Sequence, residues 1–537
     1  MVADATLKHP FNPAAPEEAL HSMLAPEIRQ PVRSERPSTL AAYSRIMQAL
    51  SLIGLTFVSM LVNGYHPNAE DAGVYIPGIK LLLDPTLYPH SRAFVVEYSH
   101  LSIFAHLIAA LVHILHLGLA PVLFSLYLFT TGLLVFACWQ MACRAFSSPP
   151  ARFAGVMLVT LCACVPVAGS ALYMSDPYLT SRSFSTPLTI LAVCALLDRR
   201  VFRSLAYLAL VLLFHPLMSI YTAGFLLMLW AVQSRSKPAV LTLFALALLA
   251  GLAITLAKRS STETLDYRAA VLTRQYFYLS QWHWYEWIGL ICPIAILAAY
   301  AYLQRSSRDP ERRGGAVLAA TAAIVGSLSI AVCLLYAQPD SHSHLVATLQ
   351  PIRTFHLLFF IMFTLLGGVL QQFLLLQKPW RWLLFFYPLA ISLFLVQHLG
   401  TYPASPQVEF PWSTSTNPWN QAFHWIRANT PTDAIVAFDP NYIGANQEDA
   451  QGFRAIGERS SLADYSKDGG AAAVFPTLAG QWMREHTATS GLNTLTDPQR
   501  IARMRPFGVH WMVLPATAPT QLPCPYRNPS VQVCTLP

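Results

Sequence analysis

The chain has 537 residues, of which 54% are hydrophobic and only 12% are charged, and its formal net charge is +8. This composition, with a mean hydropathy of +0.43, excludes an ordinary soluble globular protein and predicts a membrane protein. The positive charge does not indicate binding to nucleic acid, because the Lys and Arg residues lie in short clusters between apolar stretches.

The first segment, residues 1–45, is polar and contains several prolines. It lacks the short apolar core and the small-residue cleavage site of a secretory signal peptide. We therefore expect a cytosolic N-terminal segment, followed by a first span near 46–62 that stays in the protein as an anchor.

The apolar stretches of residues 46–400 predict a helical bundle. Helices are expected because an isolated strand cannot satisfy its backbone hydrogen bonds in lipid. The predicted fold class is therefore mainly α, a polytopic membrane bundle of about eleven transmembrane helices, each near the length needed to cross the hydrocarbon core. The predicted spans lie near 46–62, 121–143, 153–172, 184–197, 203–215, 217–233, 239–257, 286–303, 315–338, 356–376 and 382–399.

The long outer loop 63–120 ends in a stretch that decides the topology. Residues 101–120 are apolar enough to span, but they carry His106, His113 and His116 on roughly one helical face. If the stretch lies along the membrane surface, the basic clusters of the later loops fall on the N-terminal side, as the positive-inside rule requires. If it crosses, they face the other side. We interpret it as an interfacial amphipathic helix.

The tail, residues 401–537, then lies on the outer face. After a linker rich in Pro, Ser and Thr, it shows helix and strand patterns, such as FHWIRANTP followed by AIVAFDP, which predict a small α/β extracytoplasmic domain. Near its end, Cys524 and Cys534 bracket a turn-rich segment, which suits a disulfide across a hairpin in an oxidising compartment. The remaining cysteines lie in or beside predicted spans, where an apolar role is expected.

In the outer loop, the adjacent carboxylates Glu70 and Asp71 closely follow the first span, with His66 and His100 nearby in the sequence. Adjacent carboxylates at a membrane surface can act as a general base on a hydroxyl, or can hold a divalent cation. They can equally begin or cap the helix that follows. The sequence leaves these alternatives open.

This arrangement resembles the GT-C superfamily of membrane glycosyltransferases, whose members combine a first span, an acidic motif in a long outer loop, interfacial helices, further spans and often an outer domain. The resemblance covers the whole chain as architecture, and its only motif is Glu70-Asp71. It implies transfer of a sugar from a polyprenyl phosphate to an acceptor on the outer face. Asp71, or second Glu70, would accept the acceptor's proton.

The resemblance also implies cations that stabilise the departing lipid phosphate, because negative charge grows there in the transition state. Arg353 and Arg182 each lie where an outer loop re-enters the membrane; snorkelling at a helix end is the alternative. We expect further substrate-binding residues among His66, His100, His215 and Glu286.

Several of these residues have simpler explanations. His215 precedes a proline between two spans and suits a helix kink, and Glu286 lies in an aromatic run typical of an interfacial belt, although such rings can also stack on a sugar. His342 and His344 in DSHSH lack an identifiable third metal ligand. The tail strings KDGG and ERSSLAD are predicted to be turns without a catalytic role.

More narrowly, strings such as AEDAGVYIPGIKLLLDPTLYP and GERSSLADYSKDGG resemble those of a group of uncharacterised bacterial multi-pass membrane proteins. This resemblance implies the bacterial inner (cytoplasmic) membrane, with the C-terminal domain in the periplasm.

Two other classes of function remain open. A transporter or flippase of envelope lipid or glycan would show inverted repeats and charges at the membrane midplane, and a non-catalytic scaffold would present the tail to envelope partners. The expected partners are membrane lipid and a polyprenyl-phosphate-linked sugar, with no nucleic acid, and the expected cofactor is either none or a divalent cation. The sequence does not define the donor sugar, the acceptor or the oligomeric state.

Overall fold

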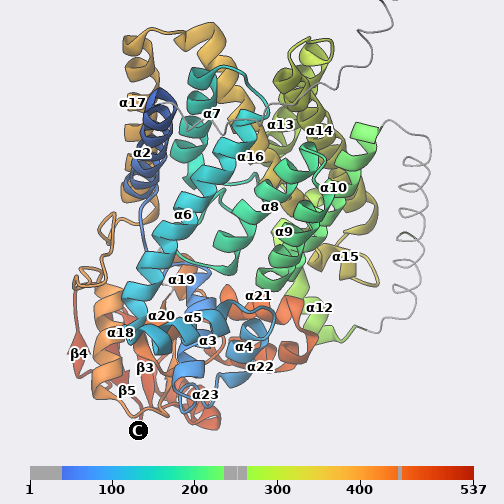
Figure 1. Ribbon diagram of the computed structural model, residues 1–537. Helices are drawn as coiled ribbons and strands as arrows, with labels where there is room; N and C mark the ends of the chain where they lie inside the picture. The colour runs from blue at the N-terminus through green and yellow to red at the C-terminus, as the bar shows by residue number, and fades with distance from the viewer. Residues whose placement is uncertain (1–38, 235–250, 252–262, 446–449, 451) are drawn as a thin grey trace, which may run out of the picture. The chain divides into compact units, whose positions relative to one another are not determined.

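The computed structural model describes residues 39–234, 251, 263–445, 450 and 452–537 (Figure 1). The chain divides into two compact units, Met1–Ser51 and Leu52–Pro537, and the helix α2 (Thr39–Asn63) runs from the first into the second. Everything that follows concerns the second unit. The predicted span at 239–257 lies outside the described residues, apart from residue 251.

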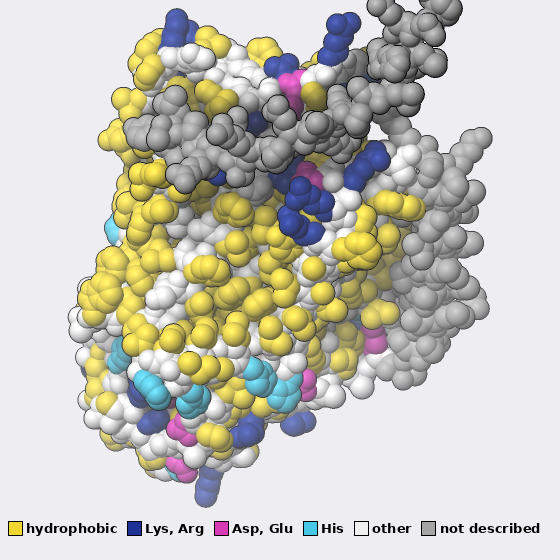
Figure 2. Space-filling view, viewed as in Figure 1, with side chains coloured by type: hydrophobic (Ala, Val, Ile, Leu, Met, Phe, Trp, Pro, Cys, Tyr) yellow, Lys and Arg dark blue, Asp and Glu magenta, His cyan; other side chains and the backbone are white. Residues whose placement is uncertain are grey.

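Long apolar helices confirm a helical membrane protein. Seven described helices are long and apolar enough to cross a membrane. Figure 2 shows a band of hydrophobic side chains over the helices, with histidines at its lower border. The seven are Arg45–Asn63 of α2, α6 (Leu119–Cys143), α10 (Pro216–Ser234), α13 (Trp284–Gln304), α14 (Pro310–Tyr336), Leu345–Leu375, which includes α15 (Leu345–Thr348), η4 (Pro351–Thr354) and α16 (Phe355–Leu370), and Pro379–Thr401, which includes α17 (Pro379–Leu395).

Three further predicted spans are shorter apolar helices, so the predicted count of spans is not confirmed. They are α7 (Pro149–Leu161), α8 (Ser181–Leu197) and α9 (Val201–Phe214). Nearly every residue of α8 is buried in the protein. A helix surrounded by protein does not need a full apolar length, because its ends need not reach the lipid headgroups on their own.

Glycines bring α7 and α16 into close contact. A Cβ atom at Gly155 of α7 would lie 2.5 Å from the carbonyl oxygen of Thr364, and one at Gly367 of α16 would lie 2.6 Å from that of Ala154. Small residues at such contacts let helix backbones approach each other, which is how helices pack where lipid surrounds them.

The outer loop folds into three helices, α3 (Ala72–Leu83), α4 (Arg92–Ser99) and α5 (Phe104–Leu115), and α4 and α5 meet at 91°. The 12 residues of α5 extend only about 18 Å, less than the hydrocarbon core of about 30 Å. Its buried face includes Phe104 and Ile108, whereas His106 and His113 are exposed. The helix is amphipathic, as predicted; its position on the membrane surface stays a prediction.

The tail contains the predicted small sheet, with strand order β2-β1-β3-β5-β4. β1 pairs parallel with β2 and β3, and β5 pairs antiparallel with β3 and β4. The predicted helix and strand after the linker are confirmed as α18 and β1. The tail elements are α18 (Pro418–Asn429), β1 (Ile435–Ala437), α19 (Tyr442–Ala445), α20 (Phe453–Gly457), β2 (Ser460–Ser461), α21 (Lys467–Val474), α22 (Ala479–Thr489), α23 (Asp497–Met504), β3 (Trp511–Pro515), β4 (Tyr526–Arg527) and β5 (Val531–Thr535).

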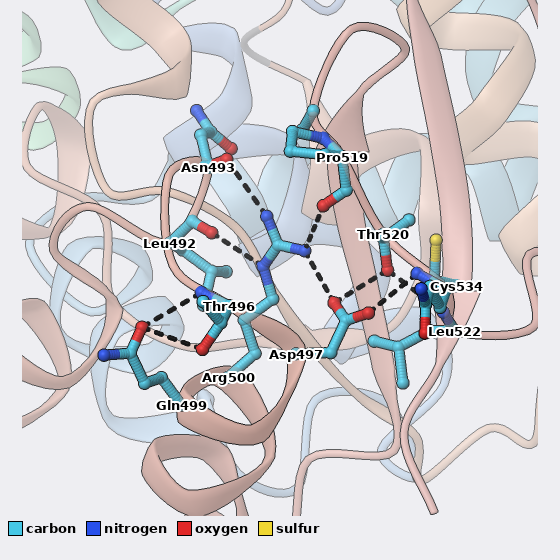
Figure 3. Close-up of polar contacts among 12 residues, drawn as sticks. Leu492, Asn493, Thr496, Asp497, Gln499, Arg500, Pro519, Thr520, Leu522 and Cys534 are labelled. Atoms are coloured by element: carbon cyan, nitrogen blue, oxygen red, sulfur yellow. Dashed lines mark hydrogen bonds and ion pairs between the residues drawn. The ribbon is translucent and has the colours of Figure 1, made fainter.

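A buried arginine connects the loops at the far end of this domain (Figure 3). Arg500 of α23 donates hydrogen bonds to the carbonyl oxygens of Leu492 (3.0 Å) and Pro519 (2.9 Å) and to the carboxylate of Asp497 (2.8 Å). Leu492 precedes α23, Asp497 begins it and Pro519 follows β3, so one side chain connects three segments of the chain before β4. In the same region, a disulfide joins Cys524 to Cys534 of β5.

Candidate functional site

The acidic pair lies between the first span and α3. Asp71 occupies the N-cap position of α3, but its side chain makes no capping hydrogen bond. The simple explanation that this carboxylate caps the helix is therefore wrong for Asp71. Its side chain keeps about 33% of its surface exposed and pairs with cations instead.

Two cations from distant parts of the chain meet this pair. Arg182 donates from Nη2 to Oδ2 of Asp71 at 2.7 Å, and Lys467 lies with its Nζ 3.3 Å from Oδ1 of the same carboxylate. Lys467 also forms an ion pair with Glu70. The cluster thus joins the outer loop, the start of α8 and the start of α21 in the tail.

Local sequence explains why Arg182 lies there. α8 begins with a capping box in which the side chain of Thr180 accepts from the backbone N–H of Ser183 and the side chain of Ser183 accepts from that of Thr180, so the helix start is firmly defined. Arg182 follows in that turn and is only 7% exposed. A cation buried to this degree needs compensating carboxylates, and it has two, since its Nε also donates to Asp176 at 3.1 Å.

Lys467 was missed because KDGG was predicted to be a turn, whereas it is the first turn of α21. The helix dipole disfavours a lysine at the start of a helix, and the ion pairs of Lys467 with Glu70 and Asp71 offset this effect. Gly469 in the same turn also has a reason: a Cβ atom there would lie 3.1 Å from Nη2 of Arg274 and 3.0 Å from Nε1 of Trp482.

The cluster lines a cavity of about 550 Å³. Four cations and two carboxylates face it, so its charge favours an anionic ligand. Aromatic side chains form part of its wall, and Leu101, Ile220 and Leu349, which are 46%, 56% and 36% exposed, give it an apolar rim. The charged lining residues are Glu70, Asp71, Arg182, Arg274, Arg353 and Lys467.

Arg353 also lines this cavity, and part of its guanidinium is buried without a partner among the described residues. It lies on η4, the short helix that leads into α16. Within the described residues, its Nε is buried without a hydrogen-bond partner, and so is Oε1 of the neighbouring Gln350, which also lines the cavity. Because buried polar atoms are nearly always hydrogen-bonded, these two atoms mark a place where a polar ligand fits.

Arg274 also lines the cavity, but its guanidinium bonds to the backbone of the tail. It was not singled out from the sequence. It donates to the carbonyl oxygens of Tyr465 (2.6 Å) and Ser466 (2.9 Å), and its guanidinium lies over the Tyr465 ring. It therefore holds the residues just before Lys467, and so positions that ammonium group.

Positive charge keeps Asp71 ionised. Burial alone would raise its pKa, but the charges of Lys467 and Arg182, the Arg182 hydrogen bond and the more distant Arg353 outweigh burial and hold the pKa below its ordinary value. The carboxylate is therefore ready to accept a proton at neutral pH, although it is a weak base.

The structure brings together five of the residues singled out from the sequence: Glu70, Asp71, Arg182, Arg353 and His215, which also lines the cavity. Three others lie outside its lining. His66 donates from Nδ1 to Glu409 at 2.9 Å and stacks on Tyr402. His100 is exposed after α4, and Glu286 accepts from the backbone of His283 in a capping box of α13.

A divalent cation does not fit the donor set of the described residues. Among them, no group of three or more His, Cys, Asp or Glu side chains converges. Glu70 and Asp71 are engaged by Lys467 and Arg182, and His344 bonds to Glu263 at 2.6 Å and to the carbonyl oxygen of Pro339. We therefore derive no step through a metal.

No protein-family model matches the chain, and no curated protein matches it. Among solved structures, it is similar to the archaeal oligosaccharyltransferase AglB from Archaeoglobus fulgidus, solved in complex with an inhibitory peptide and a dolichol-phosphate. The two chains share 10% identity over 88% of this chain and 70% of that one, with a TM-score of 0.46. The likeness concerns the course of the chain alone.

Proposed function

We propose that this protein is a membrane glycosyltransferase that moves a sugar from a polyprenyl phosphate to an acceptor on the outer membrane face. One observation carries the proposal. The ionised carboxylate of Asp71 and the side chain of Arg353, whose buried Nε has no hydrogen-bond partner among the described residues, line the same cavity, and that cavity has an apolar rim.

Each part has a role in the reaction. The bond between the sugar's anomeric carbon and the phosphate oxygen breaks, and a bond from the acceptor oxygen to that carbon forms. Asp71 accepts the proton that the acceptor hydroxyl loses. Arg353 neutralises the negative charge that grows on the departing phosphate, where a preorganised donor acts most strongly.

A weak base suits this chemistry. When the phosphate leaves ahead of attack, the sugar carbon becomes strongly electrophilic, and the acceptor needs only a hydrogen-bond acceptor that is ionised when attack occurs. Lys467 and Arg182 keep Asp71 in that state. The apolar rim formed by Leu101, Ile220 and Leu349 gives the prenyl chain a path to the cavity from the lipid.

A transporter explains this arrangement less well. Coupling charges in transporters lie near the membrane midplane. Here Arg182 lies in the first turn of α8, Arg353 lies on η4 before α16, and Lys467 lies in the tail. The charges of the cavity thus lie at the ends of helices.

The test compares Asp71→Asn with Asp84→Asn. Asp84 belongs to the same loop, and within the described residues its side chain bonds only to Thr86. Purified protein is incubated with a panel of polyprenyl-phosphate sugars and acceptors, and released polyprenyl phosphate is measured by mass spectrometry. We expect Asp71→Asn to lose at least about 100-fold in turnover while Asp84→Asn keeps it. Equal turnover of the two variants would rule out the proposed role.

A further inference from the structure

A second, larger cavity lies among the opposite ends of the helices. Its volume is about 780 Å³, and it is bounded by the C-terminal ends of α6, α8, α10 and α13 and by the start of α14. Nothing in the proposed reaction uses it.

Two helices fix the distance between the cavities. Arg182 and Leu197 of α8 line the outer and the second cavity respectively, and so do Leu217 and Val232 of α10. Each pair is 15 residues apart, which corresponds to about 22 Å along a helix. The second cavity therefore lies toward the other face of the membrane.

Its charged lining is predominantly basic. Arg144, Arg199, Arg305 and Arg313 face it, against Asp198 and Glu311. Arg144 is engaged, because it forms two hydrogen bonds with Asp198 at 2.9 and 2.6 Å. Across residues 39–234 and 263–445, no ion pair engages the other three arginines. Three guanidinium groups are thus available to an anion.

The cavity's walls are apolar and small. Ala301 of α13 and Gly314, Ala316 and Ala320 of α14 line it, so few large side chains fill the space between these helices. Gly314 is needed for packing, since a Cβ atom there would lie 2.6 Å from the carbonyl oxygen of Arg144. A lining that combines arginines with small apolar residues matches the chemistry of a lipid, whose anionic headgroup carries hydrocarbon chains.

Helix dipoles and the positive-inside rule explain why arginines collect at these helix ends. They do not explain why a hollow of this size lies between three arginines, Arg199, Arg305 and Arg313, that have no carboxylate partners among the described residues. We infer that this cavity is a second binding site, for the phosphate of an anionic phospholipid or for free phosphate, at the membrane face opposite the glycosyl-transfer site.

The test uses the full chain in nanodiscs of phosphatidylcholine. Phosphatidylglycerol is added in one arm, and inorganic phosphate is added in the other. Native mass spectrometry counts the bound lipid, and the melting temperature of the protein is measured in both arms. The variant is Arg305→Gln/Arg313→Gln. The matched control is Arg308→Gln, which lies in the same loop but outside the cavity lining.

We expect wild type and Arg308→Gln to bind and to be stabilised alike, and the double variant to bind about 5- to 30-fold more weakly. Stabilisation by phosphatidylglycerol alone assigns the site to a lipid headgroup, and stabilisation by inorganic phosphate assigns it to free phosphate. Equal binding by double variant and wild type in both arms overturns the inference, and so does an equal loss in Arg308→Gln. Should the double variant fold poorly in plain phosphatidylcholine, Arg199→Gln replaces it, with the same two outcomes.

Discussion

Lys467 in the tail forms an ion pair with Glu70 in the first outer loop, across 397 residues of sequence. The last domain of the chain therefore completes a cavity whose other walls come from the outer loop and the bundle. A second pair, Lys80 with Glu458 at 2.5 Å, also joins the loop to the tail but lies outside the cavity lining. The Lys80–Glu458 pair attaches the tail to the loop, whereas the Lys467–Glu70 pair also places charges in the cavity lining.

Lys467→Gln is expected to raise the pKa of Asp71 toward its ordinary value of about 4, because it removes the largest of the charges that lower it. A carboxylate with a lowered pKa stays ionised at pH values above that pKa and becomes protonated as the pH falls below it. The low-pH limb of the pH–rate profile should therefore move to higher pH. Lys80→Gln is the control and should leave that limb in place; an unshifted limb in both variants would contradict the prediction.

Arg353→Gln is expected to weaken binding of a lipid phosphate about 10- to 100-fold, because it removes a cation of the cavity lining whose buried Nε has no partner within the described residues. Binding is measured with farnesyl phosphate, by its effect on the melting temperature. Arg268→Gln changes the outer-side charge equally but lies outside the cavity lining, and should bind like wild type. If Arg353 only snorkels at a helix end, the two variants will bind alike.

Asp464→Asn is expected to remove a pH-dependent loss of stability. Burial, and then the neighbouring Asp468, raise the pKa of Asp464 to about 7. For a raised carboxylate pKa, the stabilising contribution is complete below the unfolded value of about 4 and is lost as pH rises to about 7. The melting temperature of Asp464→Asn relative to wild type should therefore rise between pH 4 and 7. A difference that stays constant over this range would refute the assignment.

Gly155→Ala and Gly367→Ala are expected to destabilise the bundle, because the added methyl groups would meet backbone carbonyls of the facing helix. A cost of about 1–3 kcal/mol each is typical of overpacking. Gly224→Ala on α10 is the control, because nothing lies within 4 Å of its Cβ position. The check is the melting temperature in one detergent, where the first two variants should fall clearly below the third.

Loss of the disulfide should weaken the tail selectively. Replacing Cys524 and Cys534 by alanine opens a loop of 10 residues, and the expected cost is about 2–3 kcal/mol. Cys292→Ala, at an exposed position on α13, should cost little. Thiol labelling of the unfolded wild type with and without reductant measures the bond directly, and labelling of both cysteines without reductant would show that it does not form.

Local patterns predicted much of this molecule. Apolar length predicted the long helices, and the strand pattern near 435 predicted β1. Among the site residues, Asp71 and Arg182 lie 111 residues apart in sequence; Asp71 was singled out as one of two adjacent carboxylates, and Arg182 by its position where a loop re-enters the membrane. Arg353 was found in the same way.

What local patterns could not reveal is contact between distant segments. Lys467 and Arg274 gain their roles only when α21 packs beside α12 (Leu265–Leu272) and the outer loop. His66, His100 and Glu286 were singled out for their chemical type. In the structure, His66 bonds to Glu409 of the tail, His100 is exposed, and Glu286 belongs to the capping box at the start of α13. Their surroundings depend on packing that a single sequence does not encode locally.

The contact of Lys467 with Glu70 also bears on the ambiguous stretch 101–120. Residues joined by an ion pair lie on the same side of the membrane, so the chain must cross an even number of times between them. The predicted spans after 120 number ten, which meets this condition only if 101–120 does not cross. On this predicted count the pair agrees with the interfacial interpretation of α5, and both the count and the position of α5 stay predictions.

Translation runs from the first residue to the last, so the ribosome delivers Lys467 only after every membrane helix has emerged. Until the tail has folded against the loop, Glu70 and Asp71 lack one of their cations, so a newly inserted bundle does not yet have the complete charge cluster. Chains that end before α21 should accordingly insert into the membrane and remain inert.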